Sequence, residues 1–238
     1  MKNQRPSEKL YPDVVPGQVI GVRIPADRVT LDGDFAVPAD SRGVVMFAHG
    51  SGSSRHSPRN RYVAQFLNQA GLATLLIDLF TREEEAVDIR TAELRFDIAF
   101  LARRLVRATD WLIRQPRAEK LKIGYFGAST GAAAALVAAA ESPGNMAAVV
   151  SRGGRPDLAG ATLRKVKAPT LLIVGGDDTP VIPLNRKALD ELQCEKRLEI
   201  VPGATHLFEE SGALEQVARL AREWFELHLG GQSATRVA

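Results

Sequence analysis

The pentapeptide Gly127-Ala128-Ser129-Thr130-Gly131 is the stretch from which the fold can be predicted, because of what lies on either side of it. The apolar run 122–126 before it has the composition of a buried strand, and the alanine-rich run that begins at Ala132 reads as a helix able to lie close to a sheet. A serine on a sharp strand-to-helix turn is held in a strained backbone conformation with its hydroxyl projecting into a cleft. The alternative for the same pattern is a glycine-rich helix start that is capped by the serine or threonine.

Candidates for a base and an acid follow two later strand-like runs. The apolar run 170–176 is followed by Asp177 and Asp178, and the run 197–201 is followed by a turn that ends in His206. A serine hydroxyl needs a base to accept its proton, and that base is commonly a histidine oriented by a carboxylate. The carboxyl ends of parallel strands open on one face of a sheet, so these side chains are expected to meet there. The order serine, acid, histidine is the order of the nucleophile-elbow fold.

Taken together, these motifs resemble the α/β-hydrolase superfamily, and within it the compact dienelactone-hydrolase-related branch. The resemblance covers roughly residues 44–229. The segments that carry it are Phe47-Ala48-His49-Gly50-Ser51-Gly52, Gly127-Ala128-Ser129-Thr130-Gly131, Gly175-Gly176-Asp177-Asp178 and Gly203-Ala204-Thr205-His206. The chain departs from the family in one respect, because dienelactone hydrolases use a cysteine nucleophile and this chain has Ser129. That departure favours ordinary ester chemistry over dienelactone cleavage.

The resemblance implies an α/β fold made of one α/β-hydrolase domain over residues 1–238, with flexible tails at 1–13 and 230–238. It implies a mostly parallel central sheet with helices on both faces, an antiparallel N-terminal edge and no large cap domain. It also favours Asp178 over Asp177 as the acid beside Ser129 and His206. The backbone amides of Ser51 and Thr130 are the expected donors of the oxyanion hole.

A larger set of side chains is expected around the rim of the site. The residues expected to contact substrate are Arg55, Arg59, Phe80, Arg152 and Phe208. The arginines, together with Arg155, either bind a carboxylate of the substrate or form structural ion pairs, and the second alternative is favoured.

The other reactive residue types have simpler interpretations. His49 is expected to stabilise the structure of the loop in which it lies, and His56 to be an exposed loop residue. His228 is expected to be either a surface residue or one that interacts with the dipole at the C-terminal end of its helix. Cys194 is expected to be a buried small apolar residue. The run 83–85 of three glutamates lacks histidine or cysteine at ligand spacing, so a solvated acidic run is favoured over a metal site.

Hydrophobic periodicity places the remaining elements. Antiparallel strands are expected over 18–38, with a turn at Asp32-Gly33, and an amphipathic helix is expected over 93–115, stopped by Pro116. The other expected strands are 43–48, 72–79 and 147–151, and the other expected helices are 62–69, 183–192 and 214–229. The segments 151–168 and 80–92 are too short for a folded lid.

Composition limits the classes of protein to which the chain can belong. Of 238 residues, 45% are hydrophobic and 25% charged, which is ordinary for one globular domain. A single cysteine excludes an internal disulfide, and the polar start of the chain shows no signal peptide, so a cytoplasmic location is expected. The net charge of +3 arises from interleaved charges with 6% aromatic residues, so neither nucleic acid nor a membrane is expected as a partner. The expected state is a monomer or homodimer.

The function expected is hydrolysis of carboxylic esters with small or short acyl groups through an acyl-serine, with no cofactor and no metal. A thioesterase, lactonase or acyltransferase would use the same three residues and remains an alternative. A cofactor-free haloperoxidase on the same scaffold is a further alternative. A non-catalytic binding module on this fold is the remaining one.

Overall fold

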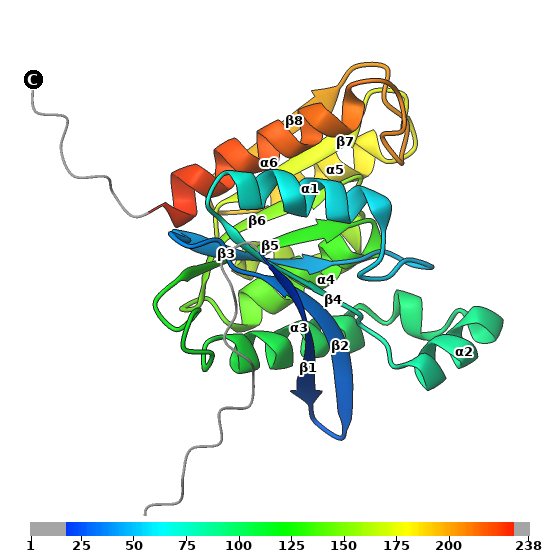
Figure 1. Cartoon of the computed structure of the whole chain (residues 1–238). Coiled ribbons are helices and arrows are strands. Elements are labelled where there is room, and N and C mark those ends of the chain that lie inside the picture. Colours follow the sequence, from blue (N-terminus) through cyan, green and yellow to red (C-terminus); the bar gives the residue numbers. More distant parts are fainter. Residues whose placement is uncertain (1–17, 231–238) are drawn as a thin grey trace, which may run out of the picture.

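The computed structural model describes residues 18–230, which form an eight-stranded, mostly parallel sheet in the order β1-β2-β4-β3-β5-β6-β7-β8 (Figure 1). The antiparallel pairs are β1 with β2 and β2 with β4, and all the other neighbours are parallel. The strands are β1 (Val19–Ala26), β2 (Val29–Ala36), β3 (Gly43–Ala48), β4 (Ala73–Ile77), β5 (Lys122–Ala128), β6 (Met146–Arg152), β7 (Thr170–Gly175) and β8 (Lys196–Val201). The prediction of an α/β-hydrolase fold with an antiparallel N-terminal edge is confirmed.

Helices cover both faces of this sheet. The α-helices are α1 (Pro58–Gln69), α2 (Arg82–Thr91), α3 (Ile98–Leu112), α4 (Thr130–Glu141), α5 (Ile182–Glu191) and α6 (Ala213–Leu229); the 3-10 helices are η1 (Leu94–Phe96) and η2 (Pro156–Lys165). Helices α1 and α6 lie side by side on one face, and α3 and α4 lie on the other (Figure 1). Helix η2 packs against α4 and α5.

Each face of the sheet has its own apolar core. Successive residues of a strand point to opposite faces, so Val45 and Phe47 of β3 pack under α1 and α6, whereas Val44 and Met46 pack under α3 and α4. All six residues of β3 are buried, as are all six of β7. A strand covered on both faces must be apolar throughout, which is why these segments read as continuous hydrophobic runs.

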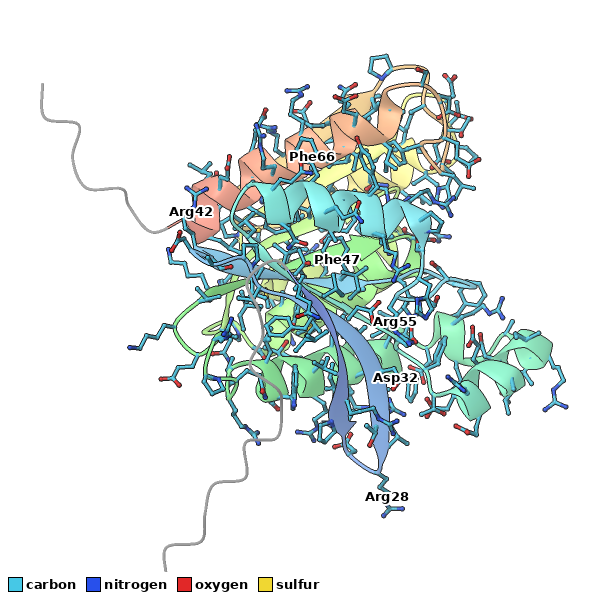
Figure 2. The ribbon with its side chains drawn as sticks, in the orientation of Figure 1. Arg28, Asp32, Arg42, Phe47, Arg55 and Phe66 are labelled. Carbon is cyan, nitrogen blue, oxygen red and sulfur yellow. The ribbon has the colours of Figure 1, made fainter. Side chains whose placement is uncertain are left out.

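The turn of the N-terminal hairpin is not where the sequence predicts it. The predicted Asp32-Gly33 turn is wrong, because both residues lie inside β2 and pair with β1. The chain reverses at Asp27, which has a positive φ of 55°, and Arg28 lies at the tip (Figure 2). Gly33 is closely packed, since an added Cβ would lie 3.1 Å from the side chain of Val22.

Two helix starts also differ from the predictions. Helix α1 begins at Pro58 rather than at 62, because the Ser57 side chain caps the amide of Asn60 and proline is favoured in the first turn. The helix predicted over 93–115 is shorter, and Asp97 caps α3 in front of residue 98. A separate 3-10 turn occupies Leu94–Phe96.

Helix α2 was not predicted at all, although its signal is present in the sequence. Thr81 and Glu84 form a capping box, in which each side chain accepts a hydrogen bond from the backbone amide of the other. The glutamate run 83–85 therefore forms the first turn of a helix, where negative charge is favourable. Helix α2 lies at the periphery of the molecule (Figure 1).

Within residues 18–230, no helix combines the length and the apolar character needed to cross a bilayer. The predicted N-terminal tail (1–13) lies outside the described residues, as does nearly all of the predicted C-terminal tail (230–238). A cytoplasmic location and a monomeric or homodimeric state stay predictions.

Candidate active site

Ser129 lies between β5 and α4 in a backbone conformation that few residues adopt. Its φ is 50° and its ψ is −123°, so a non-glycine residue has a positive φ at the point where the strand turns into the helix. A Cβ on Gly127 would lie 2.5 Å from Cα of Ala132, and one on Gly131 would lie 2.3 Å from the carbonyl oxygen of Ala48. The two glycines are therefore required by close approach of the backbone, which is the geometry of a nucleophile elbow.

The candidate base and acid are hydrogen-bonded to each other. Nδ1 of His206 lies 2.7 Å from Oδ2 of Asp178, although the two residues are 28 positions apart. Asp178 is buried, whereas the side chain of His206 is 39% exposed. Asp177, the alternative acid, is exposed. Of the two carboxylates, Asp178 is therefore the one in contact with the histidine.

A short turn after β6 connects Ser129 to His206. The carbonyl of Arg152 accepts a hydrogen bond from the amide of Ser129, at 3.4 Å. The next residue, Gly153, lies against the histidine, since an added Cβ would be 2.9 Å from its carbonyl oxygen and 3.6 Å from its Nδ1. This contact brings the loops after β5, β6 and β8 together at the carboxyl edge of the sheet. The sequence did not indicate the role of this turn.

The loop after β3 packs directly on the nucleophile. A Cβ on Gly50 would lie 2.8 Å from Cβ of Ser129, and Oγ of Ser51 lies 3.1 Å from Oγ1 of Thr130. The two residues expected to provide the oxyanion hole are thus neighbours, although they are 79 positions apart in the chain. Backbone amides on both sides of the serine are what a tetrahedral oxyanion requires.

His49 stabilises this loop through two hydrogen bonds of its ring nitrogens. Its Nδ1 donates to the carbonyl of Gly50 at 2.9 Å, and its Nε2 accepts from the amide of Leu79 at 3.0 Å. Burial lowers the pKa of His49 below its ordinary value of 6.5. A neutral imidazole with its proton on Nδ1 satisfies both hydrogen bonds, so the geometry agrees with the predicted structural role.

Three of the four predicted rim arginines form ion pairs with carboxylates. Arg55 pairs with Asp78, which also accepts a hydrogen bond from its backbone amide, and with Asp34 at 3.4 Å. Arg59 pairs with Glu209 at 2.8 Å. Arg155 donates two hydrogen bonds to Asp157, at 2.8 and 2.9 Å. Figure 2 shows Arg55 between the ends of α1 and α2.

Arg152 differs from these because no carboxylate among residues 18–230 pairs with it. It is 6% exposed, donates to Oδ1 of Asn60 at 3.2 Å, and has its guanidinium 5.9 Å from the ring centre of Phe208. Its Nε has no hydrogen-bond partner in the part of the chain that the structure describes. Burial, with a smaller effect of the charge on Arg59, lowers the pKa of Arg152 to about 10.

The two predicted aromatic contacts lie in different places. Phe208 is buried, follows His206 by two positions, and has a positive φ of 57°. It borders a groove between the start of α1 and the loop before α6, whose lining is Pro58, Arg59, Tyr62, Phe208, Glu209, Glu210, Ser211, Gly212, Leu214 and Glu215. Phe80 is half-buried after β4, with its ring 6.3 Å from that of His49 and stacked on Phe100.

The remaining candidates lie away from this edge or have no visible role in it. His56 is exposed, as expected. The surface position predicted for His228 is wrong, since its side chain is only 12% exposed and its ring packs on Trp224. Cys194 is half-buried beside Thr170, and burial raises the pKa of its thiol. Among residues 18–230, no three histidine, cysteine or carboxylate side chains are grouped as metal ligands would be.

A sequence model of one family matches this arrangement over most of the chain. The match is to the "Dienelactone hydrolase family", over residues 31–227. The chain belongs to the dienelactone hydrolase family. The resemblance predicted from the motifs is therefore confirmed, and the family is one of hydrolases.

Solved structures agree with this membership. The crystal structure of a dienelactone hydrolase from Anabaena variabilis is 63% identical, has a TM-score of 0.88, and covers 89% of this chain and 98% of its own. Est1E from Butyrivibrio proteoclasticus, 16% identical with a TM-score of 0.72, covers 86% of this chain and 97% of its own. The second likeness shows the shared fold alone.

A curated relative from Mycobacterium tuberculosis is named as a transferase rather than as a hydrolase. That protein, "Putative phosphoribosyl transferase", is 59% identical over 210 residues, which are 88% of this chain and 46% of the relative. The chain thus spans less than half the length of the curated relatives that it matches.

Proposed function

We propose that this member of the dienelactone hydrolase family is a serine hydrolase that cleaves carboxylic esters through an acyl-serine intermediate. The observation that carries the proposal is the 2.7 Å hydrogen bond between His206 and Asp178 at the same sheet edge as the strained elbow of Ser129. A binding module has no use for a strained serine and a histidine paired with a buried acid. The same arrangement is what nucleophilic catalysis by serine requires.

In this mechanism the proton of Ser129 moves to His206 and then to the leaving alcohol, while Asp178 stays ionised. The Nδ1–H of His206 donates a hydrogen bond to Asp178, which leaves the lone pair of Nε2 free to accept the proton of Ser129. Oγ of Ser129 forms a bond to the ester carbonyl carbon while that proton moves to Nε2. The imidazolium then returns the proton to the leaving alcohol as the carbon–oxygen bond breaks. Asp178 keeps the imidazole in the required tautomer and stabilises its cationic form.

The negative charge that develops on the carbonyl oxygen is placed between the loop after β3 and the start of α4. The amides of Ser51 and Thr130 are the proposed donors, each worth about 2.7–4 kcal/mol in comparable sites. The contact between the hydroxyls of these two residues supports their closeness. Water then repeats the attack on the acyl-enzyme, with His206 again accepting and returning the proton.

We propose esters of small or short acyl groups as substrates, because the connections around the site within residues 18–230 contain short helices and no separate lid domain. The segment between β6 and β7 is the 3-10 helix η2, which packs on α4 and α5. Helix α2 lies at the periphery (Figure 1). A thioester or lactone would pass through the same acyl-serine, so the acyl carrier has to be tested directly.

The name of the mycobacterial relative does not contradict this proposal. This chain corresponds to less than half of that protein, so an activity named for the whole relative can lie in the part that the two do not share. The proposal concerns only the shared part.

The test is a substrate panel with matched variants. Short p-nitrophenyl esters, an acyl-CoA thioester and a lactone are offered to the full chain, to Ser129→Ala and to Ser142→Ala. We expect ester turnover in the wild type and in Ser142→Ala, whose serine caps the far end of α4, and a loss of several orders of magnitude in Ser129→Ala. Wild-type turnover in folded Ser129→Ala would overturn the proposal, and preference for the thioester or lactone would change the acyl carrier only.

A further inference from the structure

We infer that Asn185 of α5 is a positioning residue for the proposed site. It joins the loop that carries Asp178 to the turn 152–155, which contacts both Ser129 and His206. The inference rests on the proposed function and extends it to a residue outside the three side chains. Asn185 is fully buried, with 0% exposure, and does not touch the reacting atoms. Its effect is exerted through the turn 152–155.

The turn 152–155 is bonded to Ser129 at both ends. The amide of Ser129 donates to the carbonyl of Arg152, at 3.4 Å, and the carbonyl of Ser129 accepts from the amide of Arg155, at 3.0 Å. Between these bonds, Gly153 lies against the backbone and ring of His206. The position of the turn therefore sets the separation of nucleophile and base.

Asn185 attaches this turn to the loop of the acid. Its Nδ2 donates to the carbonyl of Gly154, at 3.0 Å, and to the carbonyl of Val181, also at 3.0 Å. The amide of Val181 in turn donates to the backbone carbonyl of Asp178, at 3.0 Å. A continuous path of hydrogen bonds thus runs from Asp178 through Asn185 to the turn that contacts His206.

The amide of Asn185 supplies two donors from one atom. Both partners of Nδ2 are backbone carbonyls in a buried place. The carbonyl of Val181 also accepts from the backbone amide of Asn185, so losing Nδ2 costs the carbonyl of Gly154 its bond to α5 and leaves that of Val181 bonded. Within residues 18–230, Oδ1 of Asn185 is buried without a hydrogen-bond partner, so the two donated bonds are the side-chain bonds of this residue there. An aspartate of the same shape would place a charged oxygen against two carbonyl oxygens.

The experiment compares variants that remove the donors with a control that removes an equivalent pair of bonds elsewhere. Asn185→Leu keeps the volume but lacks donors, and Asn185→Ser keeps a hydroxyl that can bond the carbonyl four residues back but is shorter than the amide. Thr109→Ala is the control, since Thr109 is buried and bonds both the carbonyl of Leu105 and Tyr125, far from the site.

Two readouts are needed, and one of them does not depend on turnover. With the ester found in the panel, we expect kcat per active site to fall about 10- to 100-fold in both Asn185 variants, with KM within about threefold, because a small misplacement of reacting groups is costly. Thr109→Ala should lose stability but keep kcat. In proton NMR of the full chain, the low-field Nδ1 proton of His206 should be lost or broadened in the Asn185 variants and kept in Thr109→Ala.

The outcomes separate this inference from the proposed function. Wild-type kcat per active site together with an intact low-field proton in folded Asn185→Leu would overturn the role of Asn185. If Ser129→Ala retains turnover, the proposed function fails, and the proton resonance alone still decides whether Asn185 holds His206 on Asp178. A loss of the resonance in Thr109→Ala as well would assign the effect to general destabilisation and would also overturn the inference.

Discussion

Replacing Gly131 by alanine should destabilise the protein and impair catalysis, although helix propensity predicts the opposite. Gly131 is the second residue of α4, where alanine would be favoured over glycine by up to about 1 kcal/mol. In the folded chain, however, the added Cβ would lie 2.3 Å from the carbonyl oxygen of Ala48 and 2.5 Å from that of His49. Both neighbours are backbone atoms, which cannot move away by rotating a side chain.

The size of the effect follows from those distances. Ordinary contact begins at 3.4 Å, so the two backbones must separate by about 1 Å. Overpacking of this kind costs about 1–3 kcal/mol, which exceeds the gain in propensity. The segment that must move leads directly into Ser51, so the proposed oxyanion donor moves too, and loss of one such donor lowers kcat by about 10²–10³-fold.

The assay is urea unfolding together with ester turnover for Gly131→Ala and for Gly144→Ala. At Gly144 an added Cβ meets no atom within 4 Å, so this control should stay within about 0.5 kcal/mol of the wild type and keep its kcat. A Gly131→Ala protein that is as stable as the wild type, with unchanged kcat, would show that the elbow is not packed as tightly as described.

Three further predictions follow from single residues. For the proposed triad, Asp178→Asn should lower kcat by about 10⁴-fold, while Asp177→Asn, at an exposed position, should stay within about twofold; equal effects in the two variants would reassign the acid. Because burial lowers the pKa of His49, the unfolded chain binds more protons than the folded chain as pH falls below 6.5, so urea midpoints should drop between pH 7.5 and 5.5 and drop less in His49→Gln. His228, whose pKa is lowered too, accounts for part of the remaining pH dependence, and an identical pH dependence in His49→Gln would contradict the prediction. Arg152→Met should unfold at an equal or higher urea concentration, with a gain on the order of 3 kcal/mol at most, because it removes a buried charge that none of the described carboxylates balances. A loss of stability would mean that the hydrogen bond of Arg152 outweighs its desolvation.

The parts of the fold and site that could be predicted are those set by local chemistry. The elbow requires glycines at fixed positions around Ser129, and buried parallel strands require continuous apolar runs, so both are visible in one sequence. The order of Ser129, Asp178 and His206 followed from the ends of such strands. Among residues 18–230, the structure gives a hydrogen bond between His206 and Asp178, and the meeting of Ser129 with this pair stays a prediction.

The parts that were missed depend on contacts between distant segments. Gly33 looks like a turn residue, but it lies in β2, where it pairs with β1 and β4 and the side chains of Val22, Ile24 and Leu75 pack around it. Helix α2 has a weak apolar stripe, so its capping box was the only local signal. Asn185 and the turn 152–155 have no motif, since their importance arises only when α5 packs against the end of β6.

The most direct test of the account is to find where an active-site phosphonate binds covalently. The full chain, Ser129→Ala and His206→Ala are incubated with a fluorophosphonate, and the modified peptide is identified by mass spectrometry. The account predicts one adduct, on Oγ of Ser129, absent from Ser129→Ala and formed far more slowly in His206→Ala. An adduct on another residue, or ester turnover by a wild-type protein that the probe leaves unmodified, would contradict it.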